Sequence, residues 1–482
     1  MRFPHFASKC FLCGAGEDCF DTATRVCSCM RLRGFPEPEL SCYVTMLPEL
    51  VDYSVSKLPS LWAENPCDVF AVAAGTLGSS SDSVAKQRDS IGDQRSTYLS
   101  PGDLLEKSHH LRCGNATLYR AGGLEDLTGS ELVLVLDMGS YYWSGTLKDP
   151  RSWAIVNAAL AHGITDISLW TAGNAGLSLA KLAYFANRRL SPDTRLQIHA
   201  IVDQDVDGDI RTQLRLWQCD VLDLFRRDKP VLNPLEIRGL VAARLRRSRR
   251  RLDDASYWHV TDGWDGVGLL AYRLVAAQIF RDLGAVFPTR GPQQAIDVVL
   301  PVGTGDLLLG FYLGLRDCER SGLIEPGSWR LIGAVPGGAN ILANIRQRSI
   351  PGQMNGSGSS PNGAGPVMPK LKGVYTPLAP CLMRMEKEGL VEFVVVTEED
   401  QIRAGRQVLS GGIDDGIVAE PSALASFAAL PYLGESSNGH GGHGEYSYHR
   451  GRRVLIVNSG LGVLGGAEEK FLYSALGSSV LC

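Results

Sequence analysis

The chain has 482 residues, 44% of them hydrophobic and 21% charged, and its formal net charge is −4. This length exceeds what one ordinary core fills and predicts two domains with additional segments. The small net charge gives no argument for nucleic acid or a membrane surface as a partner, and we expect neither. Because no apolar run reaches the ~20 residues that cross a bilayer and the first residues lack the apolar stretch of a secretory signal, we expect a cytoplasmic protein.

Residues 1–45 form a cysteine-rich head. Cys10-x-x-Cys13 and Cys27-x-Cys29 have the paired spacing that lets two turns present four thiolates to one tetrahedral metal ion. In a reducing compartment such a cluster indicates structural zinc before disulfides. The alternative is a degenerate ribbon without metal, because Cys19 lies between the pairs. Residues 46–113 are expected to be an N-terminal extension and loop.

From residue 114 onward, apolar runs alternate with amphipathic stretches, which is the pattern of a parallel sheet with helical crossovers. We expect strands at residues 132–136, 166–170, 198–202, 295–300, 331–335, 391–396 and 454–457. We expect helices at residues 152–161, 177–187, 267–283, 307–321 and 423–430. Alternation over more than 300 residues predicts an α/β protein with open, mostly parallel sheets and helices on both faces.

Several segments interrupt or follow this pattern. Residues 351–366 and 435–446 are rich in small polar residues and are expected to be insertions. The second contains His440 and His443, for which a metal site is the alternative to a solvated loop. The run 244–251 holds six arginines in eight positions, and we interpret it as a basic helix face, with a nucleic-acid patch as the alternative. Residues 466–482 form a C-terminal tail.

Two turns early in the α/β region carry chemically useful residues. Ser144-Gly145-Thr146-Leu147-Lys148-Asp149-Pro150 delivers Lys148 to the start of a helix, which we expect Asp149 to cap and Pro150 to open. The electropositive helix end favours a neutral amine that can attack an aldehyde. In Thr171-Ala172-Gly173-Asn174-Ala175-Gly176, small residues leave backbone amides open to an anion, and Asn174 offers a donor and an acceptor.

Two later turns complete the set. Gly303-Thr304-Gly305-Asp306 follows an expected strand and precedes an expected helix, so its amides can cradle a phosphate. Ser459 follows the last expected strand and places a hydroxyl at its carboxyl end, where open α/β sheets bind their ligands.

In order and spacing these four turns together resemble the fold-type II, or tryptophan-synthase-β-like, enzymes that depend on pyridoxal 5'-phosphate (PLP). The resemblance covers roughly residues 110–465 and includes Gly114-Asn115-Ala116-Thr117-Leu118 and Glu420-Pro421-Ser422-Ala423. It implies a catalytic core at 114–465 made of two α/β domains, the smaller at roughly 150–245, with PLP in the cleft between them. It also implies an amino-acid substrate, and we expect a homodimer.

The resemblance assigns roles residue by residue. It implies that Lys148 holds PLP as a Schiff base and acts as general base. The remaining roles fall on Asn174 at the pyridine hydroxyl, on Gly303, Thr304, Gly305, Asp306 and Leu307 around the phosphate, on Ser459 at the pyridine nitrogen, and on Thr171, Ala172, Gly173, Asn174 and Ala175 around the substrate carboxylate.

Two features favour the branch of threonine synthase and cysteate synthase: the zinc-ribbon-like head and a Ser-Gly-Thr-Leu-Lys-Asp turn similar to threonine synthase's Thr-Gly-Ser-Phe-Lys-Asp. Three positions depart from the family pattern. Pro150-Arg151 replaces Arg-Gly, Ala172 replaces serine, and Asp306 replaces glycine. A carboxylate beside a phosphate costs free energy unless it points away, so we expect the cradle to consist of Gly303 to Gly305 and the amides that follow.

The sequence therefore predicts a PLP-dependent synthase or lyase. We expect β- or γ-replacement or elimination on an activated amino acid such as O-phosphohomoserine or O-phosphoserine. The alternatives are a serine/threonine deaminase or racemase of the same fold and a non-catalytic scaffold. A nicotinamide dehydrogenase is disfavoured, because no Gly-x-Gly-x-x-Gly turn is followed ~20 residues later by an acidic ribose ligand.

Overall fold

The computed structural model describes residues 117–139, 144–204, 206–224, 234–248, 250–261, 265–286, 295–320, 322–337, 376, 378–409, 417, 419–433 and 452–460, and the backbone of three short strands at 7–10, 16–18 and 43–45. Cys13, Cys27, Cys29, both expected insertions and the C-terminal tail lie outside the described residues.

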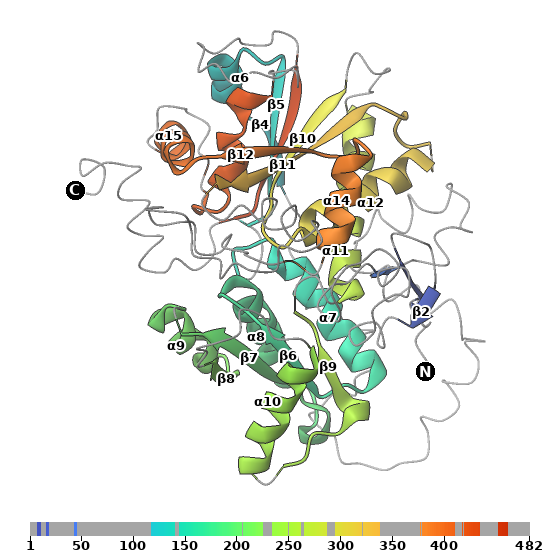
Figure 1. Ribbon diagram of the computed structural model, residues 1–482, viewed down its shortest axis with the longest axis vertical. Coiled ribbons are helices and arrows are strands. Elements are labelled where there is room, and N and C mark those ends of the chain that lie inside the picture. Colours follow the sequence, from blue (N-terminus) through green and yellow to red (C-terminus); the bar gives the residue numbers. More distant parts are fainter. Residues whose placement is uncertain are drawn as a thin grey trace, which may run out of the picture.

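The larger sheet has six strands in the order β12-β11-β10-β13-β5-β4. The strands are β4 (Thr117–Arg120), β5 (Leu132–Asp137), β10 (Ile296–Pro301), β11 (Trp329–Pro336), β12 (Glu392–Val396) and β13 (Arg453–Asn458). All neighbours pair in parallel except β4, which pairs antiparallel with β5 at the edge. In Figure 1 this sheet occupies the upper half of the molecule.

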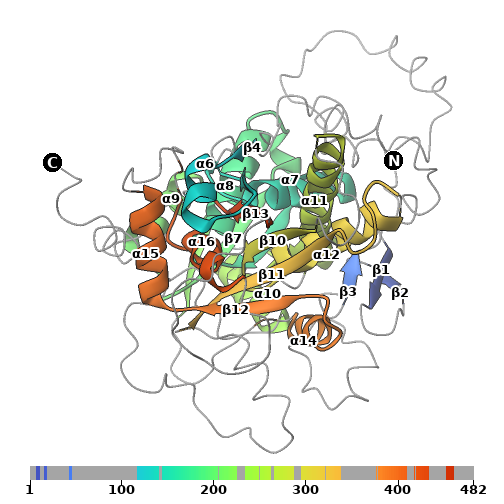
Figure 2. The same ribbon diagram turned by 90° about the horizontal axis from the view of Figure 1, so that it is seen from above.

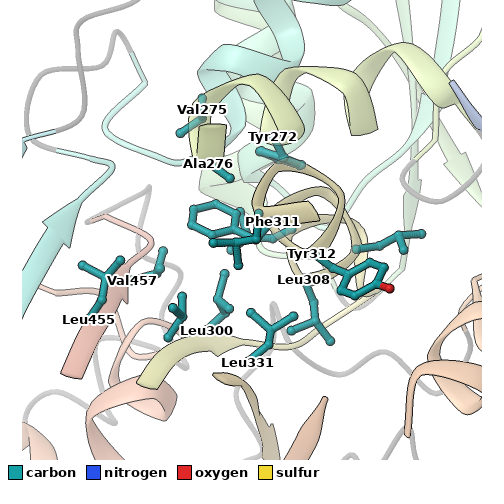
Figure 3. Packing of buried hydrophobic residues seen from close by; sticks show 14 of the residues in the cluster. Tyr272, Val275, Ala276, Leu300, Leu308, Phe311, Tyr312, Leu331, Leu455 and Val457 are labelled. Atoms are coloured by element: carbon teal, nitrogen blue, oxygen red, sulfur yellow. The ribbon is translucent and has the colours of Figure 1, made fainter. Parts of the chain in front are cut away.

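Helices cover both faces of this sheet because successive strand residues point to opposite sides. Leu132, Leu134 and Leu136 of β5 face a core shared with α11 (Gly266–Val286), α12 (Asp306–Arg320) and α14 (Ala379–Lys387). Figure 3 shows Phe311 of α12 among the strand and α11 side chains of this core. Val133 and Val135 face the other core, with α6 (Gly122–Thr128), α15 (Glu398–Leu409) and α16 (Leu424–Ala428).

The smaller sheet has four parallel strands in the order β8-β7-β6-β9. They are β6 (Asp166–Trp170), β7 (Gln197–Asp203), β8 (Asp220–Leu224) and β9 (Tyr257–His259). On one face pack α7 (Lys148–His162), α8 (Asn174–Asn187) and α9 (Gly208–Leu216). On the other face packs α10 (Pro234–Arg247).

Helices α7 and α11 connect the two sheets, and Figure 1 shows them in the middle of the molecule. Val267 and Ala271 of α11 belong to the core of the smaller sheet, while Tyr272 and Ala276 belong to the core of the larger one. One helix therefore buries one face in each core, which holds the two sheets in a defined relation.

The N-terminal strands β1 (Ala7–Cys10), β2 (Gly16–Asp18) and β3 (Tyr43–Thr45) form an antiparallel sheet in the order β2-β1-β3. Strand β3 contacts α11, and Figure 2 shows the three strands at the edge of the molecule. Cys10 is the last residue of β1.

The predicted α/β class with two mostly parallel sheets is confirmed, and each expected strand has a counterpart at nearly the expected bounds. Among the described residues, no helix combines the length and apolar composition that crossing a bilayer requires. One local prediction was wrong. Helix α7 begins at Lys148 with Leu147 at the N-cap position, so Asp149 lies in the first turn and does not cap it.

Candidate functional site

The turn that carries Lys148 and the turn that carries Ser459 are joined by their backbones. The Leu147 amide donates to the Ser459 carbonyl at 2.9 Å, and Thr146 forms an isolated antiparallel bridge with Gly460. Lys148 is the first residue of α7 and is half-buried. Its Nζ lies 6.0 Å from the ring centroid of Tyr272.

The close approach of the Lys148 turn and the Ser459 turn requires glycine at position 460. Gly460 has φ +108, and a Cβ there would lie 2.3 Å from the Gly145 carbonyl oxygen and 2.8 Å from the Gly139 Cα. Three backbone segments thus meet at a distance that leaves no room for a side chain, in a conformation that glycine favours. The expected site residues did not include Gly460.

Asp149 organises the turn that precedes its helix. Its carboxylate accepts hydrogen bonds from the Ser144 amide at 2.7 Å, the Ser144 hydroxyl at 2.5 Å and the Ser178 hydroxyl at 2.5 Å. Burial raises the pKa of Asp149, and the hydrogen bonds from Ser144 and Ser178 oppose that shift. Since Ser178 belongs to α8, the same carboxylate links the Lys148 turn to the helix that begins at Asn174.

The turn between β6 and α8 is shaped by Thr171, whose hydroxyl oxygen accepts hydrogen bonds from the Gly173 amide at 3.1 Å and the Gly176 amide at 3.0 Å. Asn174 begins α8 and is half-buried, whereas Ala172 is exposed. Ala175 is 7% exposed. Because this turn opens a helix, the amides of Ala172, Asn174 and Ala175 lie at the positive end of the helix dipole, which suits a carboxylate ligand.

Glu420 connects the sides of the site that come from different sheets. The Asn174 side-chain amide donates to its two carboxylate oxygens at 3.1 and 3.4 Å, and the Ser459 hydroxyl donates to it at 3.4 Å. Glu420 and Ser459 are each 2% exposed. The buried Glu420 carboxylate thus accepts hydrogen bonds from Asn174 and Ser459, the two side chains that the resemblance assigned to the pyridine ring of PLP. Glu420 belongs to the segment Glu420-Pro421-Ser422-Ala423, which resembles the family, but the sequence did not predict it as a site residue.

The expected phosphate loop lies between β10 and α12. Gly305 has φ +92, and a Cβ there would lie 2.8 Å from Leu382. The Thr376 hydroxyl donates to the Thr304 carbonyl, and the Thr304 hydroxyl donates to the Asp306 carboxylate at 2.5 Å. Gly303 and Thr304 are half-buried, and Leu307 is buried.

The topology brings the loop to the other turns. Strands β10 and β13 are parallel neighbours, so the Gly303 loop and Ser459 lie beyond the carboxyl ends of adjacent strands, where ligands of open sheets bind. Gly310 of α12 packs against Tyr272, because a Cβ there would lie 2.5 Å from the Tyr272 Cβ. Tyr272 in turn lies under Lys148. All four turns therefore face one region between the sheets.

The departure at Arg151 has a structural explanation. Its side chain is 1% exposed and forms an ion pair with Asp265 at 2.5 Å and a hydrogen bond to the Val260 carbonyl. The Asp265 carboxylate also accepts the Gly268 amide at 2.5 Å, in the first turn of α11. The arginine thus fastens α7 to the start of α11 in the interior.

Part of the arginine run is paired with carboxylates that surround a buried histidine. Arg244 contacts Asp220 at 3.1 Å and Arg250 contacts Asp166 at 3.5 Å. His199 lies between these carboxylates, 3.0 Å from Asp166 and 3.2 Å from Asp220. Burial alone would lower the pKa of His199, but the hydrogen bonds and charges of both carboxylates outweigh burial and raise it.

A family model described as a pyridoxal-phosphate dependent enzyme matches residues 110–460. The chain belongs to this family. Among solved structures, an O-ureido-L-serine synthase has 16% sequence identity and a TM-score of 0.50, with 76% of this chain and 94% of that chain covered. A pyridoxal 5'-phosphate-dependent aspartate racemase has 13% identity and a TM-score of 0.51, with 78% and 98% covered. At such identities the likeness shows the fold alone. No curated protein matched.

The residues present fit the cofactor that the family implies. Lys148 offers an amine for the aldehyde at the start of α7. Asn174 and Ser459, both bonded to Glu420, offer an amide and a hydroxyl for the pyridine ring. The glycine loop before α12 offers backbone amides for the phosphate. Asp306 places a buried carboxyl group directly after the glycine loop and fits less well. Within the described part of the chain, no group of three or more His, Cys, Asp or Glu is arranged to hold a metal ion.

Proposed function

We propose that this chain is a PLP-dependent synthase or lyase that replaces or eliminates a β- or γ-substituent of an activated amino acid. The observation that carries the proposal is the link from Asn174 through Glu420 to Ser459, whose backbone is bonded to the turn of Lys148. This network supports the proposal because it joins residues from both domains that the resemblance assigns to the cofactor.

The proposed roles follow from these positions. When bound, PLP supplies an electron sink for the bonds at the substrate's α-carbon. Lys148 is the amine for its aldehyde and, once released, takes or returns the α-proton at Nζ. Within residues 171–175, the amides of Ala172, Asn174 and Ala175 would orient the substrate carboxylate, because the Thr171 and Gly173 amides donate to Ile201 and Thr171. Gly303 to Gly305 and the first amides of α12, including that of Leu307, hold the phosphate.

The hydroxyl of Ser459 supports elimination or replacement over transamination. Because the Ser459 hydroxyl donates its proton to Glu420, only its neutral oxygen would face the ring nitrogen. It would stabilise a proton there less than a carboxylate does, which would favour expulsion of a leaving group. We further propose a threonine-synthase-like substrate, O-phosphohomoserine or O-phosphoserine, because the Lys148 turn is similar to that branch. The homodimer, the zinc ion on Cys10, Cys13, Cys27 and Cys29, and the cytoplasmic location remain part of the proposal.

A product assay tests this function. Purified protein with PLP is incubated with O-phosphohomoserine, O-phosphoserine, serine and threonine, with and without sulfite or a thiol, while released phosphate and new amino acids are measured. We expect phosphate release with a new amino acid, and none with Lys148→Ala. Keto acid and ammonia from serine or threonine would support the deaminase instead, and inversion of the α-carbon the racemase. Absence of any turnover and of PLP binding would favour the scaffold.

A further inference from the structure

Asp306 occupies an unusual position for a negative charge. It is the first residue of α12 and is 3% exposed, and it lies directly after the Gly303-Thr304-Gly305 turn that the proposed function assigns to the phosphate. A helix N-terminus attracts anions through its open amides and its dipole. The Asp306 carboxylate already supplies a resident anion at that terminus.

A hydrogen bond from Thr304 holds the Asp306 carboxylate at the N-terminus of α12. A threonine hydroxyl has a single proton to donate, and Thr304 donates it to Asp306 at 2.5 Å. The backbone of Thr304 is held as well, since the Thr376 hydroxyl donates to its carbonyl. The loop therefore presents a negative charge and commits its hydroxyl proton, although a phosphate would need positive potential and free donors.

We propose that Asp306, held by Thr304, acts as an internal competitor for the phosphate of the cofactor, so that this chain holds PLP more weakly than its glycine loop alone would. The inference rests on the proposed function. Two like charges within ~4–6 Å shift a binding or protonation equilibrium by about one log unit or more. Neutralising Asp306 should therefore tighten PLP binding about tenfold or more.

The chain contains a matched control pair at another helix. Asp400 lies in the first turn of α15, is 7% exposed, and accepts a hydrogen bond from the Thr397 hydroxyl at 2.6 Å. Like Asp306, it is a buried carboxylate that accepts a threonine hydroxyl, and it belongs to none of the four turns. It also accepts the Tyr432 hydroxyl at 2.8 Å and lies 3.5 Å from Arg403. Asp400→Asn consequently reports what losing a buried carboxylate at a helix start does apart from any effect on the cofactor.

The experiment measures the dissociation constant of PLP, by dialysis and by absorbance titration, for the wild type and for Asp306→Asn, Asp306→Ser and Asp400→Asn. Circular dichroism checks that each variant folds. We expect Asp306→Asn to bind PLP about tenfold more tightly, and Asp306→Ser at least as tightly because it also frees the Thr304 hydroxyl. Asp400→Asn should match the wild type. Pyridoxal, which lacks the phosphate, should bind all four proteins equally.

Unchanged or weaker PLP binding in both Asp306 variants would overturn the inference and leave the proposed function intact. Equal tightening for pyridoxal and PLP would also overturn it, because the effect would not act through the phosphate. If neither the wild type nor any variant binds PLP, the proposed function itself fails and takes the inference with it.

Discussion

Arg151→Met should destabilise the protein far more than the loss of a surface arginine, because it removes the cation from a buried pair. The side chains of Arg151 and Asp265 are each 1% exposed and lie 2.5 Å apart. Without the guanidinium, the Asp265 carboxylate keeps the Gly268 amide but loses its countercharge, and the Val260 carbonyl loses a donor. Removing one partner of a buried pair costs about 3–5 kcal/mol.

Urea unfolding of four proteins tests this magnitude. Arg151→Met should lose about 3–5 kcal/mol, whereas Arg151→Met/Asp265→Asn should lose clearly less, since asparagine keeps an acceptor for Gly268 and carries no charge. The exposed pair Arg384 and Glu388, 2.8 Å apart with 36% and 44% of the side chains exposed, provides the control. Arg384→Met should cost at most about 0.5 kcal/mol. A loss under about 1 kcal/mol for Arg151→Met would refute the reasoning.

Two further predictions concern the site joint and the buried histidine. Gly460→Ala should abolish PLP retention and destabilise the fold by about 2 kcal/mol or more, because the new Cβ would collide with Gly145 and Gly139. Gly322→Ala is the control: Gly322 has φ +71 and open space around it, so this variant should cost only the backbone strain. Equal losses of unfolding free energy in the two variants would contradict the close approach at Gly460. His199→Gln should be less stable than the wild type by a margin that is full below the unfolded pKa of 6.5 and disappears as pH rises through the raised folded pKa. A margin that grows with pH, measured by urea unfolding between pH 5.5 and 9, would show that His199 is neutral in the fold.

The elements with the strongest apolar content were predictable from the sequence. Strand β5 is buried at every residue from Leu132 to Asp137 and reads as a continuous apolar run, as central parallel strands do. Edge strands were missed because they lack such a continuous apolar run. Strand β8 has four partly or fully exposed residues out of five, and β9 has only three residues, so neither produces a clear apolar signal.

The site was predictable where a local turn carries it and not where distant residues meet. Lys148, Asn174, Gly303 and Ser459 each lie in a short motif after a strand or before a helix. Glu420 lies 246 positions from Asn174 in the chain, and no local pattern indicates that contact. Likewise, the start of α7 at Lys148 depends on a carboxylate that accepts hydrogen bonds from Ser144 and from Ser178 of another helix, so spacing alone placed the cap wrongly.

The most direct test of the central claim is to find the lysine that carries the cofactor. Protein loaded with PLP is reduced with borohydride, digested, and mapped by mass spectrometry, and Lys148→Ala is treated in parallel. We predict a phosphopyridoxyl group on Lys148 in the wild type, with Lys181 of α8, whose Nζ lies 5.6 Å from the Trp217 ring centroid, unmodified. The variant should fold, carry no such group and lose all but a trace of turnover. Modification of another lysine in the wild type, or near-normal turnover by Lys148→Ala, would contradict the account.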